Sequence, residues 1–305
     1  MLIGFIGAGR MGRPMVQRLV GDGHTVRALG RSSETRSALA EFGAEPVETA
    51  ADAVRGADAV VVCVFSDDQV RAVCSDEPLL GSLSSGATLI VHTTGSPQTV
   101  ADIAVAASPY GIEVIDAPVS GGPHDIAAGE LTVFLGGSDT AVSAARKVLS
   151  AYADPILHVG PLGTGQRVKL INNTLFAAQV GLVADAVRLG NQLGVAEQTL
   201  LAALPHASST SRALTTIAHR GTVEAFRTTA GEFLSKDVTV ARTLAAGLGA
   251  DLGILDTAIT AVIGATVSRP HPPARFVAES PELSCPSERD RARTRQPGKR
   301  SEVER

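Results

Sequence analysis

Three polar side chains near the middle of the chain have the types and spacing that chemistry requires. Lys169, Asn172 and Asn173 follow a turn-forming segment, Gly163-Thr164-Gly165, and stand at positions i, i+3 and i+4 of a helical pattern, so they share one face. Their neighbours are mostly apolar, and a lysine on such a face is costly to bury unless another group pairs with it. The pattern indicates either a functional lysine beside two amide ligands or a solvated lysine beside two surface asparagines.

The lysine stands near the start of a long helix-forming segment. Apolar residues continue from Gly163 to about Val195 without a proline. At about 1.5 Å per residue, this segment predicts a helix of roughly 45 Å. The two glycines before it let the backbone turn sharply and approach a ligand closely where the helix begins.

A second candidate site lies at the start of the chain. Gly7-Ala8-Gly9-Arg10-Met11-Gly12 directly follows the apolar run Leu2–Ile6 and precedes a helical pattern, which is the context in which G-x-G-x-x-G binds a dinucleotide. Gly7 makes the tight turn, Gly9 lets the backbone approach a pyrophosphate, and Gly12 permits close packing of helix on strand. The segment predicts a dinucleotide site; a purely structural glycine turn is the alternative.

The residues after the next apolar run, Thr25–Leu29, distinguish the two nicotinamide cofactors. An acidic residue there would bind the ribose 2′-hydroxyl of NAD and repel a 2′-phosphate. This chain has Gly30-Arg31-Ser32-Ser33 instead. Arg31 can pair bidentately with a phosphate, and Ser32 can add a hydroxyl donor. We therefore expect NADP to be preferred over NAD, the alternative being an Arg31 that stacks on the adenine or lies in solvent.

Further polar residues follow predicted strands. Ser120-Gly121-Gly122 offers a hydroxyl and consecutive flexible backbone N–H groups, which can hold a carboxylate, although a plain turn after a strand can have the same sequence. Thr93-Thr94 follows another strand. Three histidines, His92, His124 and His158, are scattered along the chain, and we expect each to be a loop or edge residue without a catalytic role.

These segments need a framework that brings the ends of strands together. Short apolar runs alternate with helical patterns up to about residue 160, and only helical patterns follow. The expected fold class is α/β: an N-terminal doubly wound parallel sheet of the Rossmann type, then an all-α domain. We expect residues 1–162 to bind the dinucleotide, residues 163–267 to form the helical substrate and dimerisation domain, and residues 268–305 to form a disordered or atypical tail. The remaining expected strands are Ala59–Phe65, Ala87–Val91, Ile112–Val119, Leu131–Leu135 and Ile156–Val159.

Composition narrows the classes of partner. The chain of 305 residues has a net charge of −4 at pH 7, which argues against nucleic acid as the main partner. Three scattered cysteines form no CxxC pair, which fits a reducing cytoplasm and no structural metal. No uninterrupted apolar run reaches the roughly 18 residues that span a bilayer, and the start of the chain lacks a basic secretory signal. We therefore expect a cytoplasmic protein without a membrane partner.

The motifs together resemble those of the β-hydroxyacid dehydrogenase family, which includes 3-hydroxyisobutyrate dehydrogenases and tartronate semialdehyde reductases. The resemblance covers Leu2 to about Leu248. It rests on the Gly7–Gly12 fingerprint, the loop Thr93-Thr94-Gly95-Ser96-Pro97, the segment from Asp116 to Gly122, the Gly163–Asn173 pattern, and Phe233-x-x-Lys236-Asp237. Five ordered motifs at family spacing are far more specific than any one of them.

The resemblance implies an activity and a set of roles. It implies reversible hydride transfer between NADP(H) and a small 3-hydroxy acid, or its semialdehyde, in a homodimer or homotetramer. Lys169 would be the catalytic lysine and Asn173 a substrate ligand. Ser120, Gly121 and Gly122 would hold the substrate carboxylate, and Thr94 and Lys236 would lie against the cofactor.

The sequence departs from the family pattern at several positions, and three other functions are alternatives. His92 occupies a position where the family often has an acid, Asp125-Ile126 replaces a common Gly-Ala, and the family's closing segment is not recognisable after Gly264. Imine reductases share the architecture but usually lack the lysine, and a 6-phosphogluconate dehydrogenase needs a longer helical domain. A cofactor-binding protein without turnover is the alternative from another class.

Overall fold

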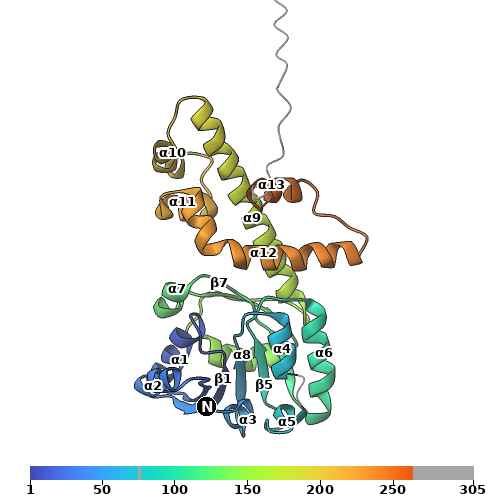
Figure 1. Ribbon diagram of the computed structural model, residues 1–305. Helices are drawn as coiled ribbons and strands as arrows, with labels where there is room; N and C mark the ends of the chain where they lie inside the picture. Colours follow the sequence, from blue (N-terminus) through green and yellow to red (C-terminus); the bar gives the residue numbers. More distant parts are fainter. Residues whose placement is uncertain (75–76, 264–305) are drawn as a thin grey trace, which may run out of the picture. The chain divides into compact units, whose positions relative to one another are not determined.

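The computed structural model describes residues 1–74 and 77–263, and the sequence forms an α/β half followed by helices (Figure 1). The tail expected from residue 268 onward lies outside the described residues. The described residues belong to one compact unit, Met1–Val267. The boundary expected between residues 162 and 163 therefore stays a prediction; it falls between the last strand, which ends at Gly160, and the long helix that begins at Thr164.

The elements in chain order agree closely with the alternation expected from the sequence. The strands are β1 (Leu2–Ile6), β2 (Thr25–Leu29), β3 (Glu45–Val47), β4 (Ala59–Val62), β5 (Thr88–Val91), β6 (Glu113–Asp116), β7 (Val119–Ser120), β8 (Thr132–Gly136) and β9 (Ile156–Gly160). The helices of the first half are α1 (Gly12–Gly21), α2 (Ser33–Glu41), α3 (Ala50–Val54), α4 (Asp67–Cys74), α5 (Glu77–Leu80), α6 (Pro97–Ala107), α7 (Pro123–Ala128) and α8 (Asp139–Leu149). The helices of the second half are α9 (Thr164–Gln192), α10 (Glu197–Ala203), α11 (Arg212–Arg220), α12 (Val223–Gly247) and α13 (Ile254–Ile263).

The sheet is mostly parallel. Its order is β3-β2-β1-β4-β5-β6-β8-β7, with β9 paired to β8. Every pair from β3 to β6 is parallel, but β8 runs antiparallel to β6 and to β7. This arrangement corrects the expectation of one strand over Ile112–Val119. The run divides into β6 and β7 around Ala117-Pro118, where proline cannot donate a ladder hydrogen bond.

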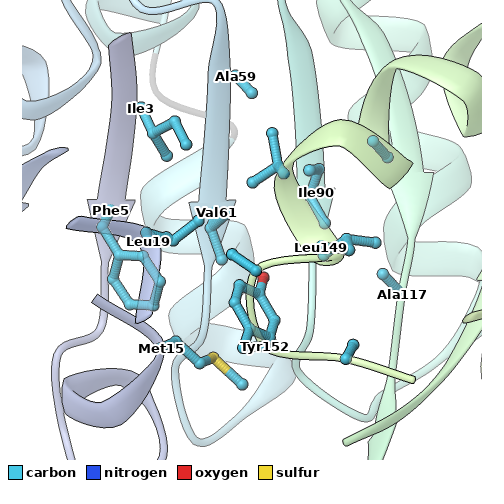
Figure 2. Packing of buried hydrophobic residues seen from close by; sticks show 14 of the residues in the cluster. Ile3, Phe5, Met15, Leu19, Ala59, Val61, Ile90, Ala117, Leu149 and Tyr152 are labelled. Atoms are coloured by element: carbon cyan, nitrogen blue, oxygen red, sulfur yellow. The ribbon is translucent and has the colours of Figure 1, made fainter. Parts of the chain in front are cut away.

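Two apolar clusters cover the two faces of the sheet. Along β1, Ile3 and Phe5 point to one face and Ile6 to the other, as the twofold repeat of a strand requires. The first face packs against α1 and α8, and Figure 2 shows Phe5, Met15 and Tyr152 within that cluster. The second face packs against α3, α4 and α6. Covering both faces explains why the central strands read as continuous apolar runs.

Helix α9 organises the second half of the chain. Helices α10, α11, α12 and α13 all pack against it. It is the only helix among residues 1–74 and 77–263 that could cross a membrane by length and composition. Charged residues such as Lys169 and Asp185 interrupt it, which is why the sequence shows no uninterrupted apolar run of that length. Its packing against four helices makes it a core helix.

Candidate active site

The glycine-rich loop between β1 and α1 is built for a ligand. Gly7 has a φ of +106°, and a Cβ there would lie 2.2 Å from the carbonyl oxygen of Cys63, so only glycine fits. A Cβ on Gly12 would lie 2.2 Å from the carbonyl oxygen of Gly7. Gly9, by contrast, has no neighbouring atom within 4 Å of its Cβ position. The protein leaves open space at Gly9, which is what a backbone that meets a pyrophosphate requires.

A cleft of about 420 Å³ opens over this loop, within the range of roughly 300–1,000 Å³ that is usual for ligand sites. Helix α1 starts at the cleft without a side-chain cap, so its first N–H groups can bind a phosphate. The lining residues are Gly7, Ala8, Gly9, Arg10, Met11, Leu29, Arg31, Thr35, Cys63, Val64, Phe65, Gln69 and Phe233. The expected cofactor residues of the loop and Arg31 therefore share one cleft.

The two residues expected to recognise a 2′-phosphate differ in their availability. Arg31 is exposed and makes no hydrogen bond or ion pair within the described part of the chain. The Ser32 hydroxyl caps α2, accepting from the Thr35 N–H at 3.1 Å and donating to the Thr35 hydroxyl at 3.0 Å. Arg31 is thus free to meet an anion, whereas Ser32 is already engaged.

Aromatic and cationic side chains from α12 meet the cleft. Phe233 and Phe65 contact each other edge to face, with ring centroids 5.3 Å apart. The Arg10 guanidinium lies 5.1 Å from the Phe233 ring, and the Lys236 ammonium lies 5.6 Å from the Phe65 ring. No role could be predicted for Phe65 or Phe233, because nothing local connects two phenylalanines so far apart in the chain.

Lys169 lies on the buried side of α9. Its side chain is only 8% exposed, and it has no hydrogen-bond partner among the described residues. Burial lowers the pKa of Lys169 from 10.5 to about 8; the Asp237 carboxylate opposes this shift and the Lys236 ammonium adds to it. The helix face that carries the three polar residues is therefore buried at Lys169 and exposed at Asn172.

Asp237 connects the polar residues around that lysine. Its carboxylate accepts from the side-chain amide of Asn173, and the Lys236 ammonium lies 2.9 Å from its Oδ1 without hydrogen-bond geometry. Lys236 also donates to the Thr94 carbonyl at 2.8 Å. Four of the expected site residues, Lys169, Asn173, Lys236 and Thr94, therefore form one group with Asp237. Asp237 is part of the motif Phe233-x-x-Lys236-Asp237, but no role was expected for it.

The loop expected to hold a carboxylate is partly used by the protein itself. The Gly122 N–H donates to the Asp125 carboxylate at 2.6 Å, so it would have to exchange this bond to meet a substrate. Gly121 has a φ of +138°, and a Cβ there would lie 2.8 Å from the same carboxylate. Asp125, which departs from the family pattern, thus holds the loop in its sharp turn. Ser120 on the short β7 is half-buried.

One of the three histidines is buried. His92 lies in the loop directly after β5, as expected, but it is only 2% exposed. Its Nδ1 lies 2.6 Å from the Ala117 carbonyl and its Nε2 lies 2.8 Å from the Tyr152 hydroxyl. Because a carbonyl only accepts, Nδ1 carries the proton and Tyr152 donates to Nε2. Burial lowers the pKa of His92 to about 4, so the ring is neutral. His124 is exposed and His158 lies on β9, as expected.

Comparisons with known proteins agree with this arrangement. Residues 2–160 match the family described as the NAD binding domain of 6-phosphogluconate dehydrogenase. Residues 163–268 match the family described as NAD-binding of NADP-dependent 3-hydroxyisobutyrate dehydrogenase.

No group of three or more His, Cys, Asp or Glu side chains that could hold a metal ion is present in the described part of the chain.

Several curated and solved relatives are dehydrogenases of small hydroxy acids. An NAD-dependent L-serine dehydrogenase from Pseudomonas aeruginosa is 35% identical over 68% of this chain and 70% of its own. A probable 3-hydroxyisobutyrate dehydrogenase from Mycobacterium tuberculosis is 34% identical over 65% of this chain and 67% of its own. A solved 3-hydroxyisobutyrate dehydrogenase from Mycobacterium tuberculosis, with L-serine, superposes with a TM-score of 0.75 at 29% identity, covering 87% of this chain and 94% of that one. The chain belongs to the 3-hydroxyisobutyrate dehydrogenase-like family of NAD(P)-dependent 3-hydroxyacid dehydrogenases.

Proposed function

We propose that the protein transfers hydride reversibly between NADP(H) and a small 3-hydroxy acid or its semialdehyde, with Lys169 as the proton donor and acceptor. The observation that carries this proposal is the burial of Lys169, within reach of the Asp237 charge, which gives it a pKa of about 8. An amine with that pKa exchanges its proton near neutral pH, as a general acid or base must. A solvated surface lysine would do so poorly, because its pKa would stay near 10.4.

The roles of the remaining residues follow from their places. The nicotinamide, when bound, supplies the hydride chemistry. In reduction, Lys169 would donate a proton to the substrate carbonyl oxygen; in oxidation, it would accept the alcohol proton. Ser120 and Gly121 would fix the carboxylate, since the Gly122 N–H is held by Asp125. Asn173 would orient the substrate and exchange one of its present bonds, to Asp237 or to Asn172, to do so.

The substrate class follows from the carboxylate and the position of the alcohol. L-Serine, which accompanies one solved relative and names another, bears its hydroxyl on carbon 3 relative to the carboxylate. We propose that this chain takes short acids of the same pattern. The half-buried Ser120 and the sharp turn at Gly121 suit a compact anion.

The cofactor preference is proposed separately, because one relative is NAD-dependent. Arg31 is exposed, free within the described residues, and at the edge of the same cleft as the glycine loop. A guanidinium there favours the 2′-phosphate of NADP. Since Ser32 is engaged with Thr35, Arg31 would provide most of the discrimination.

We also propose that the protein acts in the cytoplasm as a homodimer or homotetramer. Apolar side chains on α9 support the oligomer: Ile171 is 66% exposed, Leu182 62% and Leu189 52%. Large exposed apolar patches mark interaction surfaces in soluble proteins. Light scattering coupled to gel filtration would give the mass directly, and a monomer would remove this part of the proposal.

The function is tested with a panel of short 3-hydroxy acids, assayed for oxidation with NADP⁺ and with NAD⁺. Lys169→Ala should lower kcat by about 10²–10⁴-fold, while NADPH affinity stays within a few-fold. Lys169→Arg should be comparably slow, because a guanidinium does not release its proton near neutral pH. If Lys169→Arg keeps most of the activity, the lysine serves only as a positive charge.

The same panel separates the rival functions. Tight NADPH binding without turnover of any acid indicates a cofactor-binding protein. Reduction of a cyclic imine without oxidation of a 3-hydroxy acid indicates an imine reductase. Oxidation of a 3-hydroxy acid that depends on Lys169 supports the proposal over both.

A further inference from the structure

A carboxylate from the sheet caps the long helix that carries the lysine. Asp116, the last residue of β6, is fully buried. Its Oδ1 accepts from the Gly163 N–H at 2.6 Å and its Oδ2 accepts from the Gln166 N–H at 2.7 Å. The N-cap of α9, Gly163, has no side chain to satisfy these donors. Asp116 therefore supplies from a distant strand the cap that the helix lacks locally.

Two glycines, Gly165 and Gly136, leave room for this carboxylate. A Cβ on Gly165 would lie 2.8 Å from its Oδ2, and a Cβ on Gly136 would lie 2.3 Å from its Oδ1. The Cβ of Gly165 would also lie 2.5 Å from the Phe134 carbonyl oxygen. A side chain at Gly165 would push the helix away from the strand ends, and one at Gly136 would displace the carboxylate itself. The contact is therefore a close fit of backbone, carboxylate and helix end.

Gln166 extends the same junction to a third segment. It is 1% exposed, and its side chain bonds both ways: Oε1 accepts from the Gly95 N–H at 3.0 Å, and Nε2 donates to the Thr93 carbonyl at 2.8 Å. These two residues flank Thr94, whose carbonyl accepts from Lys236. The first turn of α9 is thus bonded to the ends of β5 and β6 at once.

We propose that Asp116 and Gln166 are positioning residues that fix the depth and rotation of α9 at the strand ends and so set the position of the Lys169 ammonium in the site. Lys169 follows Gln166 by three residues, so it lies almost one turn further along the same face. A rotation or slide of the helix end moves the ammonium directly. A displacement of about 1 Å in a reacting group can lower a rate by about 10²-fold. This inference rests on the proposed function of Lys169.

The ionised form of Asp116 is the one that fits the junction. Both oxygens accept from N–H groups, and the N-terminus of a long helix favours a negative charge. Burial nevertheless raises the pKa of Asp116 to about 6, with the two N–H groups and Arg167 opposing the shift. An asparagine at position 116 would turn its NH₂ group toward one of the two backbone N–H groups. Two hydrogen-bond donors would then face each other without an acceptor.

Two substitutions test the junction at its two sides. Asp116→Asn removes one acceptor at the helix end, and Gln166→Met removes both bonds to the Thr93–Gly95 loop at nearly constant volume. Ser138→Ala is the matched control, because Ser138 caps α8 of the same sheet through the Ala141 N–H at 3.2 Å and has no part in the site. All variants should bind NADPH within a few-fold of the unaltered protein.

Hydrogen exchange of the cofactor-free protein gives a readout that does not depend on turnover. Exchange at Gly163 and Gln166 should rise at least tenfold in Asp116→Asn, and exchange at Gly95 should rise in Gln166→Met. In both variants kcat should fall about 10–100-fold. The midpoint in the pH dependence of kcat/KM that is assigned to Lys169 should also move. Ser138→Ala should change neither exchange at these amides nor kcat by more than about twofold.

The outcomes separate this inference from the proposed function. If the unaltered protein oxidises no 3-hydroxy acid, the proposed function fails, and the inference that rests on it fails as well. If it is active and Gln166→Met loosens Gly95 but keeps its kcat and pH midpoint, the positioning role is wrong while the function stands. If Ser138→Ala lowers kcat as much as Gln166→Met, general stability is responsible and the inference fails.

Discussion

Asp237→Asn gives a sharp test of the electrostatics around Lys169. The Asp237 carboxylate is 5% exposed and raises the pKa of Lys169, against the larger effect of burial. An asparagine keeps the size of the side chain, and its oxygen can still accept from Asn173. What the substitution removes is the negative charge. The pKa of Lys169 should therefore fall below its present value of about 8.

The size of the change follows from the burial of both groups. A neighbouring opposite charge shifts a pKa by about 1–3 units, and little solvent screens this pair. We expect a drop of at least about one unit. In oxidation, where Lys169 acts as the base, the midpoint of the acid limb of kcat/KM should move down by that amount. At pH 7 the neutral fraction of the lysine would rise from about one-tenth to about one-half for a one-unit drop.

A second variant should move the same midpoint the other way. The Lys236 ammonium lowers the pKa of Lys169, so Lys236→Met should raise it. The control is Asp256→Asn, which removes the carboxylate that pairs with Arg242 of α12 at 2.6 Å, outside the site. The assay is the pH dependence of kcat/KM for oxidation at saturating NADP⁺. Midpoints that move in the same direction in Asp237→Asn and Lys236→Met, or not at all, would refute this account of Lys169.

Four further outcomes concern the cofactor, the substrate and the stability of the glycine loop. Arg31→Asp should lower the ratio of kcat/KM with NADP⁺ to that with NAD⁺ by at least tenfold, because it replaces the 2′-phosphate partner by a repelling charge. Ser120→Ala should raise the KM for the acid about tenfold and change kcat less, as initial rates over a range of substrate will show. Gly7→Ala should lower the thermal midpoint sharply because of the clash with Cys63. Gly9→Ala should keep the thermal midpoint but weaken NADPH binding in a fluorescence titration.

Features that depend on neighbouring residues were predictable from the sequence. The glycine loop lies between a strand and a helix, and both elements are where their apolar patterns indicate. The family match then confirms a dinucleotide-binding domain over residues 2–160. The short β3 was missed because three residues, one of them Pro46, carry no periodic signal. Proline in a strand is tolerated at a sheet edge, where β3 lies.

Features that depend on contacts across the chain were not predictable. His92 lies in a loop, as expected, but its burial was not foreseen, because its partners Ala117 and Tyr152 are 25 and 60 positions away. Asp125 was noted only as a departure, although its place three residues after Gly122 is the spacing at which an acid accepts from the N–H of a helix N-cap. Asp237 stood in a recognised motif without a role. His92 and Asp237 meet Tyr152 and Asn173, which only the folded chain brings near them.

The energetic cost of Lys169 connects the fold to the proposed chemistry. Its folded pKa of about 8 lies below the ordinary 10.5, so folding favours the neutral amine. The resulting penalty is absent above about pH 10.5, grows as the pH falls toward 8, and at pH 7 amounts to about 3 kcal/mol at 1.36 kcal/mol per pKa unit. A protein with a net stability of about 5–15 kcal/mol does not need such a residue for its fold, since an apolar side chain would pack on α9 without this penalty. The rigid junction of Asp116 and Gln166 one turn away holds the helix in place despite that cost, as expected where a strained feature serves a site.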